Sequence, residues 1–359
     1  MVFYVNVLQH LFSTSTKGTV FEHYMEITKD NVDKHRERTL EFGYSFFKSK
    51  VLLTAVRLDV FNIIGEKGLS AGDISAKINS NVCATETFLD AIVSLDLLQK
   101  DNDKYFNTEE GKEIFISGRD RYIGDIVILQ DVMWDAWSRL SDSVISGKPA
   151  RKPDMFQADK NETRNFIIAM HNTAMSVAPV ISREMDLSDC KTMIDLGGGA
   201  GTYSVFFCTG NSDLKATILD LPGTLKITKE LISSSGVANR IKLIEGDFNK
   251  EIKGQYDVAF LSNIIHGEGE QENIALIRRV YNALNSGGKI IIQDFILDND
   301  KASPCFPALF SLNMLLFTEN GRTYSFQEIK GWLQEAGFCD LTRMDLKLPR
   351  SISVLIGKK

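Results

Sequence analysis

The chain has 359 residues, of which 43% are hydrophobic, and a formal net charge of -6 at pH 7. This length predicts two domains, and the negative charge argues against a nucleic-acid partner, because such binding depends on clustered lysine and arginine. No apolar run approaches the ~20 residues that a membrane span needs, so we expect no membrane contact.

The first part of the chain is predicted to be mainly helical. Residues 1–12 are apolar but lack a basic flank and a small-residue cleavage site, so they are expected to begin a helical arm rather than form a signal peptide. Residues 40–64 repeat apolar side chains at three- and four-residue spacing. We therefore expect helices over most of residues 20–185.

Residues 69–108 have the plan of a winged helix-turn-helix: a short helix, a second helix over about residues 85–98, a polar turn and a β-like segment. Such units often place their second helix in the DNA major groove. Here that helix carries no lysine or arginine but three acidic residues, Glu86, Asp90 and Asp96. Phosphate repulsion makes DNA contact unfavourable, and the segment is predicted to serve packing or dimerisation.

From residue 190 onward, short β-branched runs alternate with helical stretches. This alternation predicts an α/β fold with a parallel sheet covered by helices on both faces. Two further strand-like segments, residues 340–348 and 351–359, are separated by Pro349 and Arg350. They are expected to form a terminal antiparallel pair at the sheet edge.

A glycine loop follows the first of these strands, in "MIDLGGGAGTYS" at residues 193–204. Its glycines fall as GxGxG from Gly197, whereas the dinucleotide fingerprint GxGxxG would require glycine in place of Thr202. Asp195 ends the strand, and its carboxylate would repel a pyrophosphate but attract an ammonium or sulfonium group. The loop therefore favours a ligand without phosphates.

Acidic residues also end the next two predicted strands, at Asp220 and Asp247, and Phe248 follows with an apolar ring. In open α/β sheets the ligand lies beyond the carboxyl ends of the strands. Asp220 has the spacing of an acid that accepts hydrogen bonds from two ribose hydroxyls. Each Asp alone could instead cap a helix or lie in a turn. Together with the glycine register, they predict S-adenosylmethionine (SAM) as the ligand.

At this point the chain resembles the plant and bacterial small-molecule O-methyltransferases, which include hydroxyindole, phenolic and polyketide-tailoring enzymes. The resemblance covers nearly the whole chain and rests on "DLGGGAGTYS", "ILDLPGTL", "EGDF", "LSNIIHGEGEQ", "GGKIIIQDFIL" and "GRTYSFQEIKGWLQEAGF". It implies a Rossmann-like, doubly wound and mostly parallel seven-stranded sheet at residues 186–359. It also implies a winged-helix dimerisation domain at residues 1–115 and a helical linker at residues 116–185 that contributes to the substrate pocket.

The resemblance assigns cofactor contacts to the loop and the strand ends. The family often has a lysine four residues before its catalytic histidine, where this chain has Ser262. The expected contacts are Asp195, Gly197, Gly199, Asp220, Leu221, Asp247, Phe248 and Ser262. SAM would be converted to S-adenosylhomocysteine (SAH), and no metal is expected.

His266 occupies the place of the family's general base. An imidazole titrates near neutral pH, whereas a phenol of pKa about 10 is rarely ionised unaided. Asp294 stands where the family has the first of two acids that flank the histidine, and Gly321 stands at the second place. The family often reads His-Asp-Trp, and here Gly267 and Glu268 follow the histidine. The missing acid leaves room for catalysis by proximity.

Substrate contacts are expected on two helices that the family turns toward its pocket. They are Met170, Thr173, Asn313, Met314 and Phe317, with His171 and Asn172 as neighbouring polar groups. Methionines and aromatics at helical spacing are commonly core residues, and that alternative stays open. The pocket interpretation implies a flat, largely apolar acceptor with one nucleophilic group.

The sequence thus predicts a homodimeric SAM-dependent methyltransferase that acts on a hydroxyl of a small aromatic or polycyclic metabolite. Its five cysteines are scattered without CxxC spacing, which favours the reducing cytoplasm and argues against a disulfide framework or a zinc site. One alternative is methylation of carbon, nitrogen or sulfur, or a non-methylating reaction, on the same scaffold. Another is a ligand-sensing regulator built on the winged helix.

Overall fold

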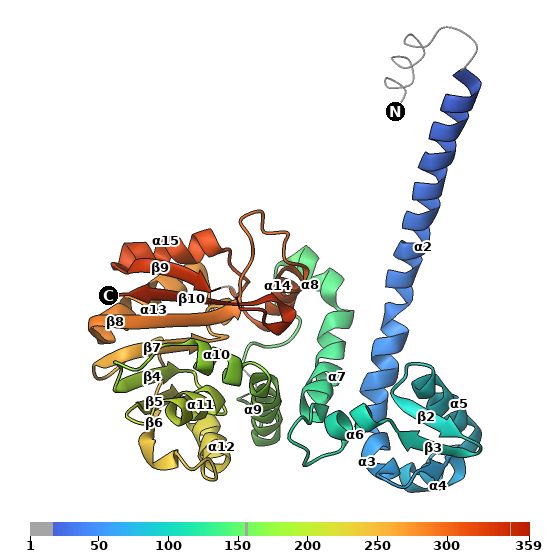
Figure 1. Ribbon diagram of the computed structural model, residues 1–359, viewed down its shortest axis with the longest axis horizontal. Coiled ribbons are helices and arrows are strands. Elements are labelled where there is room, and N and C mark those ends of the chain that lie inside the picture. Colours follow the sequence, from blue (N-terminus) through green and yellow to red (C-terminus); the bar gives the residue numbers. More distant parts are fainter. Residues whose placement is uncertain (1–16, 155–156, 345) are drawn as a thin grey trace.

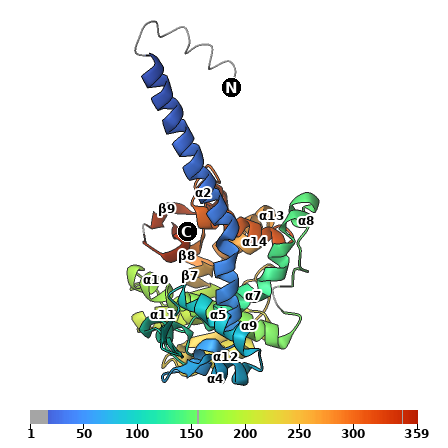
Figure 2. The ribbon, with the colours of Figure 1, turned by 90° about the vertical axis from the view of Figure 1, so that its right-hand side faces the viewer.

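The computed structural model describes residues 17–154, 157–344 and 346–359. Figure 1 shows two lobes, with the long helix α2 (Lys17–Arg57) rising from the smaller, N-terminal one. In the turned view of Figure 2, the N-terminal half of α2 again stands clear of both lobes. The predicted helical arm at residues 1–12 lies outside the described residues.

The N-terminal lobe is a winged-helix unit. It contains α3 (Val60–Ile64), β1 (Leu69–Ser70), α4 (Ala71–Ile78), α5 (Val82–Val93), β2 (Leu98–Asp101), β3 (Lys104–Asn107) and α6 (Glu109–Phe115), with the strands in the order β1-β3-β2. The second helix was predicted at about residues 85–98, whereas α5 begins at Val82 and ends at Val93. Asn81 caps its start, because its side chain accepts from Ala84 N, and the left-handed backbone of Asp96 turns the chain beyond its end.

The acidic face of α5 belongs to the packing of this lobe. Asp90 accepts hydrogen bonds from Lys100 Nζ at 2.7 Å and from the Tyr105 hydroxyl at 2.8 Å, both on the β2–β3 wing. The carboxylate that would repel DNA therefore ties the helix to the wing. This geometry agrees with the predicted packing role.

Four helices link the lobes: α7 (Gly124–Ser138), α8 (Leu140–Ser146), α9 (Lys160–Met175) and α10 (Ala178–Glu184). α7 packs against both α2 and α9, and Asp131 on α7 pairs with Lys50 at 2.7 Å and Arg57 at 3.0 Å on α2. The buried side chains of α10 join the core beneath the large sheet. Division of the chain at residues 115 and 185 stays a prediction.

The C-terminal lobe is built on a seven-stranded sheet in the order β6-β5-β4-β7-β8-β10-β9. Its strands are β4 (Thr192–Leu196), β5 (Lys215–Asp220), β6 (Ile241–Glu245), β7 (Tyr256–Ser262), β8 (Leu284–Phe295), β9 (Cys339–Met344) and β10 (Ile352–Lys358). The first five are parallel, and β10 runs antiparallel to β8 and β9. The predicted fold class and the terminal antiparallel pair are both confirmed.

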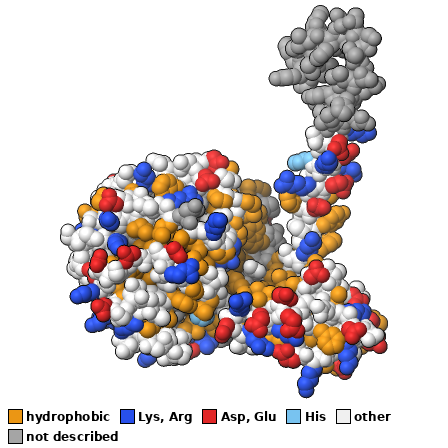
Figure 3. All heavy atoms as spheres, viewed as in Figure 1, with side chains coloured by type: hydrophobic (Ala, Val, Ile, Leu, Met, Phe, Trp, Pro, Cys, Tyr) orange, Lys and Arg blue, Asp and Glu red, His pale blue; other side chains and the backbone are white. Residues whose placement is uncertain are grey.

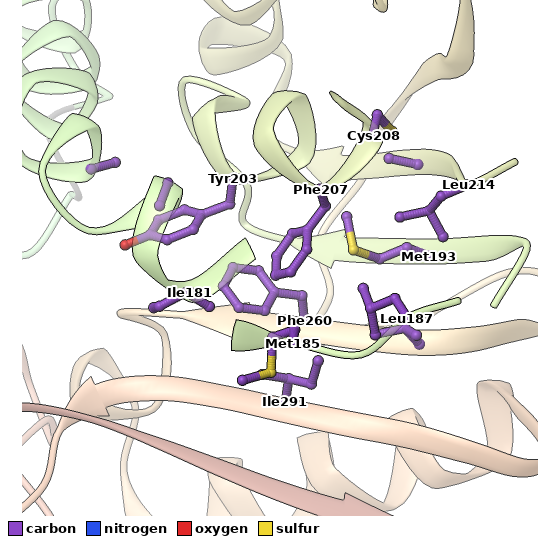
Figure 4. Packing of buried hydrophobic residues seen from close by; sticks show 14 of the residues in the cluster. Ile181, Met185, Leu187, Met193, Tyr203, Phe207, Cys208, Leu214, Phe260 and Ile291 are labelled. Atoms are coloured by element: carbon purple, nitrogen blue, oxygen red, sulfur yellow. The ribbon is translucent and has the colours of Figure 1, made fainter. Parts of the chain in front are cut away.

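Helices cover both faces of this sheet. They are α11 (Thr202–Gly210), α12 (Pro222–Ile232), α13 (Glu270–Ala283), α14 (Cys305–Phe317) and α15 (Phe326–Ala336), with short 3-10 turns η1 (Ala238–Arg240), η2 (Ile265–Gly267) and η3 (Pro349–Ser351). On one face Met193, Phe207 and Phe260 interlock beneath α11 (Figure 4). On the other, Leu276 of α13 and Trp332 of α15 are buried. The sheet is thereby held as a rigid platform whose strand ends carry the site.

In the described part of the chain, no helix combines the length and the apolar character that crossing a membrane requires.

Candidate active site

The glycine loop joins β4 to α11. Gly197, Gly199 and Gly201 all have left-handed backbone, with φ values of 61°, 53° and 75°. A Cβ added at Gly197 would lie 2.5 Å from the Ile264 side chain and 3.2 Å from the Phe248 ring. Only glycine fits such a close approach without displacing these neighbours.

A cavity of about 340 Å³ lies against this loop. All eight predicted cofactor residues line it: Asp195, Gly197, Gly199, Asp220, Leu221, Asp247, Phe248 and Ser262. Glu268, which was not among the predicted site residues, adds a further acid. Among the described residues that line the cavity there is no lysine, arginine or histidine. The described wall of the cavity is therefore acidic and offers no cation to a phosphate.

Asp195 is buried inside β4 with 1% of its surface exposed. One carboxylate oxygen accepts the Ser204 hydroxyl at 2.7 Å, and the other has no hydrogen-bond partner among the residues that the structure describes. Burial raises the pKa of this carboxyl to about 7. An unpaired acceptor next to the cavity suits a ligand that brings a donor or a positive charge.

Asp220 closes the glycine loop at the end of β5. Its oxygens accept from the backbone N–H groups of Gly199 at 2.8 Å and Leu221 at 2.7 Å, and burial raises its pKa. Asp247 lies two residues beyond β6, which ends earlier than predicted, at Glu245. Both residues line the cavity.

A buried polar group that sequence reasoning missed lies beside Ser262. Gln293 on β8 is fully buried, and its side-chain oxygen accepts from both the Ser262 hydroxyl and the Tyr203 hydroxyl, the latter at 2.7 Å. Its amide nitrogen donates to Asn263 at 3.3 Å. Tyr203, Ser262 and Asn263 all line the cavity. The signal was available, since a glutamine inside the apolar run "KIIIQDFIL" requires buried partners.

His266 lies in η2 at the end of β7, as predicted, and pairs with Asp294 on β8. Nδ1 of the imidazole is 2.6 Å from a carboxylate oxygen of Asp294, and the two side chains are 12% and 1% exposed. The imidazole ring contacts Phe310 edge-on, with centroids 5.0 Å apart, and stacks near Phe295 at 6.0 Å. His266 lies outside the lining of the 340 Å³ cavity, whereas Phe295 forms part of it.

The aromatic residues around His266 were not among the predicted substrate contacts. Phe306 and Phe310 on α14 pack on Phe295, with ring centroids 5.1 and 4.5 Å from it. These three rings and the imidazole form one cluster, which we call the aromatic cluster. Contacts between α14 and β8 depend on a fold that brings distant segments together, so chain spacing alone did not reveal them.

Gly321, at the place of the second acid, has its backbone packed on the histidine turn. A Cβ there would lie 2.5 Å from the carbonyl oxygen of His266 and 2.6 Å from the Thr318 hydroxyl. The present backbone therefore leaves no room for an acidic side chain.

The predicted substrate residues separate into two groups. Met170 and Thr173 on α9 line the cavity, whereas Asn313, Met314 and Phe317 on α14 do not. Asn313 instead accepts a hydrogen bond from Trp137 Nε1 at 3.1 Å, which ties α14 to α7. Both Asn313 and Met314 are buried, as the core alternative expects.

His171 and Asn172 have different surroundings on α9. His171 Nδ1 is 2.8 Å from the Thr202 hydroxyl, which lines the cavity, and burial lowers the pKa of the imidazole. The side-chain oxygen of Asn172 is buried and has no hydrogen-bond partner in the part of the chain that is described. His171 therefore links α9 to the start of α11.

The chain matches two protein-family models. The O-methyltransferase domain model matches residues 137–339, more than half of the chain, and the O-methyltransferase dimerisation domain model matches residues 40–114. Among curated relatives, the tetracenomycin polyketide synthesis 8-O-methyl transferase TcmO of Streptomyces glaucescens is 29% identical, over 89% of this chain and 96% of the relative. Acetylserotonin O-methyltransferase of Bos taurus is also 29% identical, over 84% and 92%.

Solved structures share the fold at lower identity. Human N-acetylserotonin methyltransferase in complex with SAM is 24% identical and superposes with a TM-score of 0.83, over 90% of this chain and 97% of that one. PigF with SAH is 23% identical, with a TM-score of 0.82, over 90% and 99%. Together with the family matches and the site geometry, these findings show that the chain belongs to the SAM-dependent O-methyltransferase family whose members carry an N-terminal dimerisation domain.

Proposed function

We propose that this protein transfers a methyl group from SAM to a hydroxyl of a small aromatic or polycyclic metabolite, with His266 as general base. The cavity fits the cofactor on three counts: glycine is required at Gly197, one oxygen of Asp195 has no partner among the described residues, and the lining residues that the structure describes are acidic and include no cation. When bound, SAM supplies an electrophilic methyl group on a positively charged sulfur, which an anionic wall attracts.

The roles of the residues that would hold the cofactor follow the family resemblance, and all eight of these residues line the cavity. Asp195 and Ser262 flank the glycine loop formed by Gly197 and Gly199, and Leu221 lies beside it. Asp220 provides acceptors for the ribose hydroxyls, while Asp247 and Phe248 form the adenine end. Met170 and Thr173 are assigned to the acceptor side, and Asn313, Met314 and Phe317 support that side from α14.

The observation that carries this proposal is the 2.6 Å pair of His266 Nδ1 and Asp294. A carboxylate that accepts from Nδ1–H fixes the imidazole tautomer and leaves Nε2 with a lone pair for the proton of the acceptor. Asp294 is nearly fully buried and also accepts from its neighbour's backbone N–H, Phe295 N, at 2.7 Å. Its carboxylate is thereby fixed, and so is the imidazole that it orients.

The aromatic cluster around the imidazole supports a flat acceptor. Phe295, Phe306 and Phe310 present ring surfaces of the kind that aromatic ligands stack on. The names of two relatives agree with this class: TcmO acts in tetracenomycin polyketide synthesis, and a Streptomyces sahachiroi relative, 28% identical, is a 3-hydroxy-5-methyl-1-naphthoate 3-O-methyltransferase.

The experiment compares wild type with His266→Asn and Asp294→Asn in a screen of phenols and naphthols with labelled SAM. Loss of a general base is expected to lower kcat by about 10²–10⁴-fold, with cofactor affinity unchanged in calorimetry. His35→Asn, an exposed site on α2, is the matched control. Wild-type kcat in His266→Asn would refute the base assignment.

A second candidate follows from the crowded position of Gly321. With no acid there, the site has one orienting carboxylate, and in-line placement of the acceptor could supply most of the rate. Methylation of nitrogen, carbon or sulfur then becomes possible, and an N,N-dimethyltransferase of Streptomyces rimosus is a relative at 24% identity. A loss of only a few fold in His266→Ala would favour this candidate.

We further propose that the protein is a homodimer formed through α2 and the N-terminal lobe. Large apolar side chains are exposed along α2, among them Phe42 at 65%, Tyr44 at 59% and Phe46 at 51% (Figure 3). A second copy would cover rings that are otherwise left in water, and the dimerisation-domain match includes them. Light scattering tests the stoichiometry. Location in the cytoplasm stays a prediction from the cysteine pattern.

A further inference from the structure

Glu268 directly follows η2, the turn that contains His266, and hydrogen bonds fix its backbone. Its backbone carbonyl accepts from the Tyr324 hydroxyl at 2.7 Å and from the Asn273 amide at 3.3 Å. Glu268 lines the same cavity as Phe248 and Asn249, and its carboxylate bonds to the Asn249 side chain. Two buried donors thus hold the backbone of Glu268 at the wall of the cavity.

The carboxylate of Glu268 is also held by a second residue that lines the cavity, Asn249. One of its oxygens accepts from the Asn249 amide at 2.9 Å. Asn249 is fixed in turn, because its backbone N–H donates to Asp247 at 2.9 Å and its side-chain oxygen accepts from Arg279 at 3.4 Å. Arg279 also donates to the carbonyl of Phe248 at 3.2 Å. A single network therefore connects Glu268 to the residues assigned to the adenine end.

One oxygen of this carboxylate is left for a ligand. Oε1 receives the Asn249 amide, while Oε2 has no protein donor in the described ranges of the chain. Burial, followed by the nearby carboxylates of Glu272 and Asp247, raises the pKa of Glu268. Glu268 is half-buried, and Oε2 is not among the buried side-chain atoms that lack a partner, so this oxygen is accessible to a ligand N–H.

From this placement we propose that Glu268 determines specificity for the base of the cofactor, by accepting a hydrogen bond from the exocyclic amine of adenine. The inference rests on the proposed SAM site and assigns a role to a residue outside the eight predicted contacts. Adenine offers that amine as its strongest donor, whereas a purine that carries hydrogen at the same carbon offers none. The Phe248 ring supplies the apolar surface for either base, so Glu268 would provide the discrimination.

The test uses calorimetry with two ligands: SAH and its 6-deamino analogue, in which hydrogen replaces the amine. Wild type is expected to bind SAH about 30-fold more tightly than the analogue, because one hydrogen bond to a charged acceptor contributes about 2 kcal/mol. In Glu268→Gln, and more fully in Glu268→Ala, this ratio should fall toward one because SAH affinity drops. Affinity for the analogue should change by less than about threefold, which also shows that each variant is folded.

Glu272→Gln is the matched control, because Glu272 is a neighbouring acid that is exposed and does not line the cavity. It should keep the wild-type ratio. Equal losses for both ligands in Glu268→Gln would assign the residue a structural role and overturn the proposal, as would an unchanged ratio. If wild type bound neither ligand, the SAM site itself would be wrong, and that outcome is distinct from the other two.

Discussion

Replacement of Asp195 by asparagine should change how the stability of the empty protein depends on pH. Burial raises the pKa of this carboxyl from 3.8 to about 7 in the folded chain. The folded state then holds this proton more tightly than the unfolded state does, so the contribution of Asp195 to stability is full below about pH 4 and is lost as pH rises through 7. A rise of the pKa from 3.8 to about 7 corresponds to about 4 kcal/mol in total, of which about 3 kcal/mol falls between pH 5 and pH 8.

Asparagine keeps the shape of the side chain and an oxygen for the Ser204 hydroxyl, but it does not titrate. Urea unfolding of both proteins at pH 5 and pH 8, without cofactor, gives the difference in unfolding free energy at each pH. Other titrating groups are common to both proteins and cancel. From pH 5 to pH 8, the unfolding free energy of Asp195→Asn should rise by about 3 kcal/mol relative to that of wild type.

The control is Asp213→Asn, an exposed acid in the same lobe, which should follow wild type at both pH values. A difference between wild type and Asp195→Asn that stays constant within about 1 kcal/mol would refute the reasoning. It would mean that water or a local movement solvates the carboxylate, and that Asp195 is ionised before any cation arrives.

Three further outcomes are expected. Gly321→Ala should lower stability by about 1–3 kcal/mol and reduce turnover, because its Cβ would meet the His266 carbonyl; an unchanged melting temperature would show that the loop moves freely. Phe46→Glu on α2 should convert the dimer to monomer in light scattering, and a persistent dimer would place the interface elsewhere. Gln293→Leu should cost about 2–5 kcal/mol in urea unfolding, since it leaves the buried hydroxyl of Tyr203 and the half-buried hydroxyl of Ser262 without their acceptor; a loss below about 1 kcal/mol would contradict this.

The cofactor wall could be predicted from the sequence because short-range rules place it. Parallel strands end at one edge of a sheet, so Asp195, Asp220 and Asp247 had to come together once the strands were identified. The glycine spacing, GxGxG rather than GxGxxG, argued against a pyrophosphate loop. The pairing of His266 with Asp294 was expected from the family resemblance, and the structure has the two side chains 2.6 Å apart.

Other features depended on contacts that no spacing encodes. The aromatic cluster forms because α14 packs against β8. Asn313 accepts a hydrogen bond from Trp137 and does not line the cavity. Asp220 proved to hold the backbone of the glycine loop as well as facing the cavity.

The chain by itself therefore determined which fold forms and which edge of it carries the chemistry, since both follow from local periodicity and strand order. Only the tertiary structure decided which side chains keep a free hydrogen-bonding atom for a ligand. Gly321 has no room for an acid and Glu268 has an oxygen to spare because of neighbours far away in the sequence. Packing between distant segments sets such partners, and packing is a property of the whole folded chain.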